Sequence, residues 1–302
     1  PVFNKEKFLN KCIASIYNLK QFINLNKEIE IVTINDCSTD KSYLLLKKWK
    51  KKIKNLKIIN LKSNKGVSFA RNLGIKNSVG NYIFFVDADD SIETKNFKKT
   101  LKLIKKNLSK DVFLFYNMIK NGNFIIKPKI NKTKQEKIFS ESIASTNSNL
   151  TKWNIWRIII KRKFVKNNKI YFKNLHQSED WIFIAMLISC KPKFLKIKKY
   201  LYTYSLKTSN SETRLLNVKN LMNSIKTFNY LKKINLKFNY QNKVLKIMLN
   251  DIKKVLFIDF FLLNRFQIRL YQKKYPYLKG IIKKNIEFRK IIDQQNKKYS
   301  TN

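Results

Sequence analysis

Residues 82–90 read Tyr-Ile-Phe-Phe-Val-Asp-Ala-Asp-Asp, an apolar run that ends abruptly in three carboxylates. The apolar part is typical of a buried strand. In an open α/β sheet, ligands bind beyond the carboxyl ends of the strands. Carboxylates crowded there repel each other unless a cation lies between them, and hard oxygen ligands suit Mg²⁺ or Mn²⁺. For an isolated Asp-x-Asp, a solvated turn that caps the next helix is the simpler interpretation.

Strand-like and helix-like segments alternate around this run. Apolar residues at helical spacing predict a helix over 8–24, with Phe8, Cys12 and Ile16 on one face. Further helices are expected over 42–52 and 68–78, and strands over 30–34, 56–61, 82–86 and 111–124. Such alternation indicates an α/β fold with a mostly parallel sheet flanked by helices. Beyond about residue 212 the strand signals fade, and 215–293 reads as lysine-rich helices.

The composition favours a polyanionic partner. The chain has 302 residues, with 65 Lys+Arg against 19 Asp+Glu and a formal net charge of +46. Nucleic acid, anionic lipid or a phosphorylated substrate would suit this charge. Lysine, asparagine and isoleucine are used heavily everywhere, so the total charge does not locate a site. No recognised nucleic-acid-binding motif is present, which argues against a nucleic-acid partner.

The cysteines and the hydropathy bear on location. Cys12, Cys37 and Cys190 form neither a zinc pattern nor a disulfide framework, which fits a reducing compartment. No apolar run approaches the roughly 18 residues that span a bilayer. We therefore expect a cytoplasmic protein, with peripheral attachment at the inner face of the cell membrane as an option.

Four motifs follow one another in the first ninety residues: Pro1-Val2-Phe3-Asn4, Asn35-Asp36-Cys37-Ser38-Thr39-Asp40, Asn64-Lys65-Gly66-Val67-Ser68-Phe69-Ala70-Arg71-Asn72 and Asp87-Ala88-Asp89-Asp90. In this order and spacing, the chain resembles the family 2 glycosyltransferases, which have the Rossmann-like GT-A fold. The resemblance is close over residues 1–95. It continues more loosely to about residue 212 through Trp153-Asn154, Glu179-Asp180 and Tyr202-x-Tyr204.

The resemblance implies a site for a nucleotide sugar, with UDP as the expected nucleotide. Its first contacts would come from Pro1, Phe3 and Asn4. Asp36 follows a strand end, where its carboxylate could accept the N–H of a uracil. Helix capping is the alternative role, and Ser38 and Asp40 suit it better. Cys37 replaces the family's usual glycine, so a positive φ at this position would be strained.

The other two motifs would hold the diphosphate. Asn64 and Gly66 form a turn before a helix start, which favours anions. Arg71 would either reach a phosphate or pair with a carboxylate of the acidic run. By resemblance, Asp89 is a direct ligand of Mn²⁺ or Mg²⁺, and Asp87 contacts the donor ribose or the metal's water shell. Asp90 is more easily explained as the N-cap of the next helix.

The acceptor side would begin at Glu179-Asp180, before the apolar run 181–188. The resemblance assigns Asp180 as the base that takes the acceptor hydroxyl proton, so that configuration inverts, while Glu179 orients the acceptor. A charged pair at a helix N-terminus is the simpler alternative. Trp153 and Trp181 are candidates for stacking on a sugar. His176 is a candidate acceptor contact, and Lys207 a phosphate contact in a covering segment.

The resemblance predicts a GT-A catalytic domain over 1–212, with a donor half over 1–95 and an acceptor half over 96–212. A basic helical region over 213–302 would either pack as a bundle or lie on an anionic membrane surface. The expected function is metal-dependent inverting transfer from a UDP-sugar to a bacterial surface glycan or a lipid-linked acceptor. A degenerate GT-A domain without turnover and a non-catalytic polyanion- or nucleic-acid-binding protein are the alternatives. A strand normally precedes the first motif in such proteins, so we expect the natural chain to extend ahead of Pro1.

Overall fold

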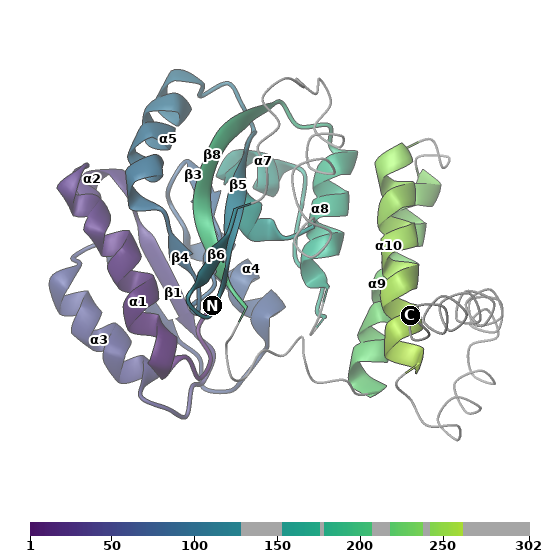
Figure 1. The fold of residues 1–302 in the computed structure, drawn as a ribbon, viewed down its shortest axis with the longest axis horizontal. Helices are drawn as coiled ribbons and strands as arrows, with labels where there is room; N and C mark the ends of the chain where they lie inside the picture. The colour runs from purple at the N-terminus through teal and green to yellow at the C-terminus, as the bar shows by residue number, and fades with distance from the viewer. Residues whose placement is uncertain (128–152, 176–177, 207–217, 238–241, 262–302) are drawn as a thin grey trace, which may run out of the picture. The chain divides into compact units, whose positions relative to one another are not determined.

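The computed structural model describes residues 1–127, 153–175, 178–206, 218–237 and 242–261 (Figure 1). The chain divides into two compact units, Pro1–Ser211 and Glu212–Asn302. The first unit contains all the described strands, and the second contains two described helices. The functional division of the first unit into donor and acceptor halves stays a prediction.

The first unit alternates helices and strands. Its helices are α1 (Glu6–Tyr17), η1 (Asn18–Gln21), α2 (Leu25–Glu28), α3 (Ser42–Lys52), α4 (Val67–Asn77), α5 (Thr94–Lys106), η2 (Ile155–Arg157), α7 (Arg162–Asn167) and α8 (Glu179–Ser189), where η marks a 3₁₀ turn. Its strands are β1 (Ile31–Asn35), β2 (Leu56–Asn60), β3 (Tyr82–Phe84), β4 (Ser91–Ile92), β5 (Val112–Asn121), β6 (Phe124–Ile126), β7 (Ile158–Lys161) and β8 (Phe194–Ser205). Each helix and strand expected over residues 8–124 has a counterpart in the structure. The helix expected over 8–24 ends at Tyr17, with η1 and α2 after it, and the strand expected over 111–124 is the β5–β6 hairpin.

The strands form two sheets, and this corrects the expectation of a mostly parallel sheet. β1 and β2 pair in parallel, as expected for strands joined through a helix. The larger sheet has the order β3-β7-β5-β8-β4, with β6 paired to β5. Among the described strands of this sheet, β5 and β8 pair in parallel and the other pairs are antiparallel. The sheet is therefore mixed, because β7 and β8 come from distant sequence that local patterns do not orient.

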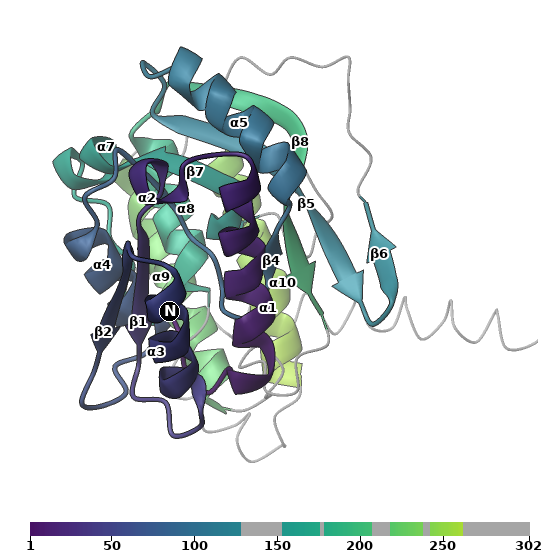
Figure 2. The same cartoon turned by 90° about the vertical axis from the view of Figure 1, so that its left-hand side faces the viewer.

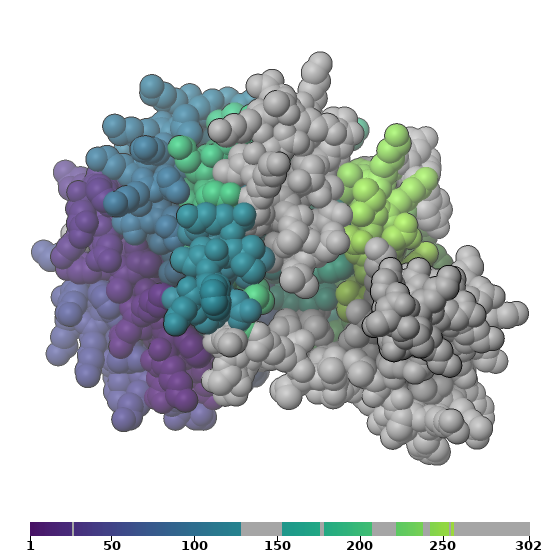
Figure 3. All heavy atoms as spheres, viewed as in Figure 1, coloured from purple at the N-terminus to yellow at the C-terminus, as the bar shows by residue number. Residues whose placement is uncertain are grey.

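The core of this unit surrounds β5, whose residues 112–119 are all buried. Figure 2 shows α1, α3 and α5 on one side of the strands and α8 on the other. Trp156 stacks on Tyr202 with ring centroids 4.8 Å apart, which ties η2 to β8. At the far end of β5, the β5–β6 hairpin reaches the surface (teal in Figure 3), where Phe124 is 78% exposed.

An apolar cavity of about 590 Å³ is lined by residues of both β1 and β3, together with α1, α4 and α5. Val2 pairs with the β1 edge on this side: its N–H donates to Ile34 O at 2.8 Å, and Asp36 N donates to Val2 O at 2.8 Å. In the described residues no named strand pairs with this edge of β1.

The second unit contains α9 (Val218–Lys237) and α10 (Lys243–Phe261), which pack against each other. Leu231, Met248 and Ile252 are buried. Both segments are helical, as expected for this basic region. Within the described ranges, no helix combines the length and the apolarity needed to cross a membrane.

Candidate functional site

The first two motifs interlock through side-chain-to-backbone hydrogen bonds. Asn4 N donates to Ser38 Oγ at 3.1 Å, and Thr39 N donates to Asn4 Oδ1 at 2.8 Å. Glu6 N donates to Asp40 Oδ2 at 2.9 Å, which satisfies an orphan donor at the start of α1. Asn4 has φ 49°, a strained value that this network maintains. The N-terminal turn is therefore held against the end of β1.

Asp36 positions the third motif. Its buried carboxylate accepts Lys65 N at 2.7 Å and Gly66 N at 2.8 Å, and so holds the turn that opens α4. Gly66 has φ +85° and open space where a Cβ would lie, so its backbone conformation explains the glycine. Cys37 has φ 59°, which confirms the strain expected where the family's usual glycine is replaced.

Arg71 joins the donor motifs to the acidic pair. Its guanidinium contacts Asp87 Oδ1 at 2.9 Å, Glu179 Oε1 at 2.5 Å and Asp180 Oδ1 at 2.9 Å. The Arg71 side chain is only 4% exposed. The three carboxylates raise the pKa of Arg71 well above its usual value, against the opposing effect of burial. Residues more than 100 positions apart are thereby brought into one charged cluster, and the alternative of Arg71 pairing with the acidic run is the arrangement found.

Burial sets the protonation of the acidic pair, which opens α8. It raises the pKa of Asp180 to about 7, and Arg71 opposes this shift. Burial also raises the pKa of Glu179. Asp180 Oδ2 accepts Ile155 N at 3.0 Å, and Ser178 ahead of the pair has φ 61°. Because both carboxylates contact Arg71, they do more than cap a helix. A carboxylate that titrates near neutral pH is suited to general base catalysis.

The remaining carboxylates of the acidic run have different partners. Asp89 Oδ2 accepts a hydrogen bond from Lys5 Nζ at 2.7 Å. Asp90 is buried; its carboxylate accepts the Tyr202 hydroxyl at 2.6 Å and Ser205 N at 2.8 Å. The N-cap role expected for Asp90 is wrong, because β4 follows it and Glu93 is the residue that precedes α5. Asp90 instead ties the acidic run to β8.

The donor set fits a hard divalent cation. Asp87 and Asp89 present carboxylate oxygens at one strand end, and one oxygen of each has no hydrogen-bond partner in the described part of the chain. That part contains no group of three or more metal-binding side chains. Two carboxylates with the remaining ligands from phosphates and water is the usual protein site for Mg²⁺.

The other predicted site residues are distributed more widely. Phe3 and Asn64 are exposed, whereas Pro1 is partly buried beside Val2. Trp153 is 2% exposed and lies 6.4 Å, centroid to centroid, from the partly buried Trp181. His176 and Lys207 lie outside the described residues.

Two residues that contribute to the site, Lys5 and Tyr202, were not identified as site residues from the sequence. Lys5 directly follows the first motif, and that proximity was the available signal. Tyr202 was noted as part of the looser resemblance and was given no role; it lies in β8, buried, and its hydroxyl accepts Asp87 N at 3.1 Å. Its spacing from Tyr204 does indicate a strand, since the two would share one face.

The comparisons with known proteins agree with this arrangement. The sequence profile described as Glycosyl transferase family 2 matches residues 1–173, and the chain belongs to this family. It is 28% identical over 184 residues to the uncharacterized glycosyltransferase EpsJ of Bacillus subtilis (strain 168), covering 60% of this chain and 52% of that protein. It is 30% identical over 206 residues to the poly(ribitol-phosphate) beta-N-acetylglucosaminyltransferase TarS of Staphylococcus aureus (strain Mu50 / ATCC 700699), covering 67% of this chain and 34% of that protein. The chain thus spans about half or less of these relatives.

Solved structures share the fold. The crystal structure of S. aureus TarS 1–349 with UDP-GlcNAc superposes with a TM-score of 0.65 at 22% identity, covering 86% of this chain and 69% of that chain. The mannosyltransferase PcManGT from Pyrobaculum calidifontis, in complex with GDP-Man and Mn²⁺, gives a TM-score of 0.53 at 11% identity, over 93% and 81% of the two chains. The predicted GT-A fold is therefore confirmed.

Proposed function

We propose that this chain is an inverting glycosyltransferase that moves a sugar from a UDP-sugar to a hydroxyl of a bacterial surface glycan. The observation that carries the proposal is the cluster in which Arg71 joins Asp87 at the donor strand end to Asp180 on α8. A donor-side carboxylate and a candidate base thus share one buried cation. Family membership supports the reaction class.

The donor would lie over the ends of β1 and β3. Asp36 still has lone pairs beyond the two that accept backbone N–H groups, so it can receive one N–H of a uracil. The turn at Gly66 and the N-terminus of α4 favour the diphosphate. Pro1, Phe3, Asn4 and Asn64 would complete the nucleotide contacts.

Asp89 and Asp87 would hold Mn²⁺ or Mg²⁺ next to the diphosphate. When bound, the cation would neutralise the negative charge that develops on the leaving UDP. The fit rests on the two carboxylates at one strand end.

Asp180 would act as the general base. In its ionised form it takes the proton of the acceptor hydroxyl, and the oxygen attacks the anomeric carbon from the face opposite to UDP. The bond to UDP breaks as the new glycosidic bond forms, so the configuration inverts. Arg71 favours the ionised form of Asp180, and Ile155 N fixes the orientation of its carboxylate. Glu179, Trp153 and Trp181 would line the acceptor side.

The names of two relatives support the proposed acceptor class. One of them is named for poly(ribitol-phosphate), and another is the minor teichoic acid biosynthesis protein GgaB of B. subtilis. We include a polyol-phosphate polymer among the acceptors for this chain. A cytoplasmic location with peripheral membrane attachment stays a prediction, to be tested by vesicle flotation at low and high salt.

A thermal-shift panel of UDP, GDP and their sugars, with and without Mn²⁺, tests the donor proposal. A rise in the unfolding temperature that requires UDP supports it. Transfer of radiolabelled sugar to polyol-phosphate or glycan acceptors then tests the reaction. UDP-sugar binding without transfer to any acceptor would favour a degenerate GT-A domain. Absence of UDP binding would contradict the proposal.

A further inference from the structure

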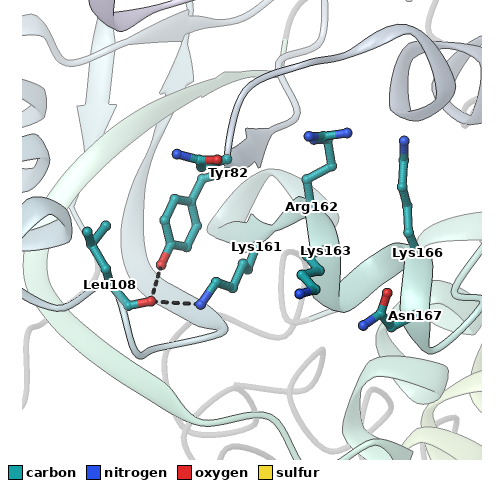
Figure 4. Close-up of a pocket in the computed structure, with 8 residues that line it drawn as sticks. Tyr82, Leu108, Lys161, Arg162, Lys163, Lys166 and Asn167 are labelled. Carbon is teal, nitrogen blue, oxygen red and sulfur yellow. Dashed lines mark hydrogen bonds between the residues drawn. The ribbon is translucent and has the colours of Figure 1, made fainter.

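A second cavity, of about 440 Å³, lies where β7 runs into α7 (Figure 4). Its lining joins three segments of the first unit: Asn81, Tyr82, Leu108, Lys161, Arg162, Lys163, Lys166 and Asn167. Tyr82 begins β3, whereas Asp87 follows that strand's other end. Five residues of extended chain span roughly 16 Å, so this cavity is separate from the donor cluster.

The charged side chains that line the cavity are all positive. Four of its lining residues are cationic and none is acidic. None of these four cations takes part in an ion pair among the described residues. The nearby Asp111 forms no ion pair with them among the described residues, and its Oδ2 accepts Lys193 N at 2.9 Å. Four cations around one hollow repel each other, so an anion bound there would be stabilised by all of them.

Two of the cations are held in place by backbone carbonyls. Lys161 Nζ donates to Leu108 O at 2.7 Å, and the Tyr82 hydroxyl lies 3.1 Å from the same oxygen. Arg162 Nε donates to Gly80 O at 2.8 Å, which leaves the Nη groups of the guanidinium without a partner in the described residues. Figure 4 shows Arg162 and Lys166 extending in the same direction from α7. The fork of an Arg with adjacent Lys point charges suits a phosphate.

We propose that this cavity binds a phosphate group of a phosphodiester-linked acceptor polymer, at a distance from the reacting hydroxyl. The proposal rests on the proposed function. A volume of about 440 Å³ is sufficient for a phosphate with its attached polyol. A membrane-binding surface would combine cations with several exposed apolar side chains. Leu108 is the only exposed large apolar residue in this lining, so the polymer is the better match.

The site would act as a tether. One repeat of the polymer would lie at Arg162 and Lys166 while another repeat reaches Asp180. Loss of the tether should therefore raise the KM for the polymer and leave kcat and UDP binding unchanged.

The test compares two variants of equal charge change in the full chain. R162Q/K166Q removes two cations from the cavity. K48Q/K51Q removes two exposed lysines from α3, outside both sites. Calorimetry would measure the binding of an oligo(glycerol-phosphate), of orthophosphate and of phosphatidylglycerol vesicles. We expect the Kd of the oligomer to rise at least about tenfold in R162Q/K166Q, since the loss of one charge-assisted contact already has that effect, and less than twofold in the control.

The other outcomes are decisive as well. An equal loss of oligomer affinity in both variants would mean that only the total charge matters, and would overturn the proposal. Unchanged oligomer affinity in both variants would also overturn it. Weakened vesicle binding with unchanged oligomer binding would assign the cavity to a lipid headgroup. Orthophosphate binding that the oligomer does not displace would assign it to a free anion. UDP titration of the same variants separates this test from the proposed function: wild-type protein that fails to bind UDP contradicts that function, whatever the cavity binds.

Discussion

Replacing Lys5 with methionine should make the free protein bind Mn²⁺ more tightly. The Lys5 ammonium contacts Asp89 Oδ2 at 2.7 Å, where a metal ligand is proposed. A cation that binds Asp89 must therefore displace Lys5. Methionine keeps much of the side-chain length and removes the competing charge.

The magnitude follows from the geometry of the pair. A hydrogen bond to a charged group contributes about 1.5–3 kcal/mol. The Lys5 and Asp89 side chains are 20% and 18% exposed, so solvent screening favours the lower end of this range. Since about 1.4 kcal/mol is a factor of ten, the Kd of nucleotide-free protein for Mn²⁺ should fall roughly tenfold.

The assay is a titration of nucleotide-free protein with Mn²⁺. Binding is monitored by calorimetry or by the electron paramagnetic resonance signal of the free ion. Lys7→Met is the matched control, because Lys7 is exposed two residues further along. Lys5→Arg keeps the charge and should bind Mn²⁺ like the wild type. An unchanged or weaker affinity in Lys5→Met would refute the reasoning, since Lys5 would then orient Asp89 and not compete for it.

Two further predictions concern the buried Arg71 cluster, and a third concerns Asn72, the next residue of α4. Asp180→Asn should reduce transfer by about 10²- to 10⁴-fold and leave UDP affinity within twofold in calorimetry; substantial residual transfer would place the base elsewhere. In the wild type, kcat/KM should fall below about pH 7 as Asp180 is protonated. Arg71→Gln should move this acidic limb of the pH profile to higher pH, because Asp180 loses the cation that favours its ionised form. An acidic limb that does not move in Arg71→Gln would exclude Asp180 as the titrating group. Asn72→Ala removes two hydrogen bonds of 2.9 Å to the backbone of Phe172, and denaturant titration should show a loss of about 1–3 kcal/mol in the free energy of unfolding; an unchanged midpoint would contradict this role.

Local patterns were sufficient for the first half of the fold. Apolar periodicity places α3, β1 and β2 within a residue or two of their observed bounds, because each is a short element with a clear period. The pairing of β3 with β7 was beyond such reasoning. Tyr82 faces Lys161 across nearly eighty residues, and its antiparallel direction depends on how the intervening chain packs.

Part of the site was also accessible from sequence. A strand that ends in Asp87, Asp89 and Asp90 indicates an anionic edge, and the motif order indicates a nucleotide-sugar site. The hydrogen-bond partners of these carboxylates could not be predicted from the sequence. Asp90 was expected to cap a helix, but its contacts are with Tyr202 and Ser205, more than 110 residues away.

The sequence alone determined the family, the alternation of strands and helices, and which side chains carry the candidate chemistry, because these depend on residue type and short spacing. The tertiary structure alone decided the mixed sheet, the Lys5–Asp89 contact and the burial that brings the pKa of Asp180 to about 7. These features depend on contacts between distant segments and on the exclusion of water. Arg71 depends on both the sequence and the tertiary structure. Its motif is recognised in the sequence, but only folding brings three carboxylates into contact with it.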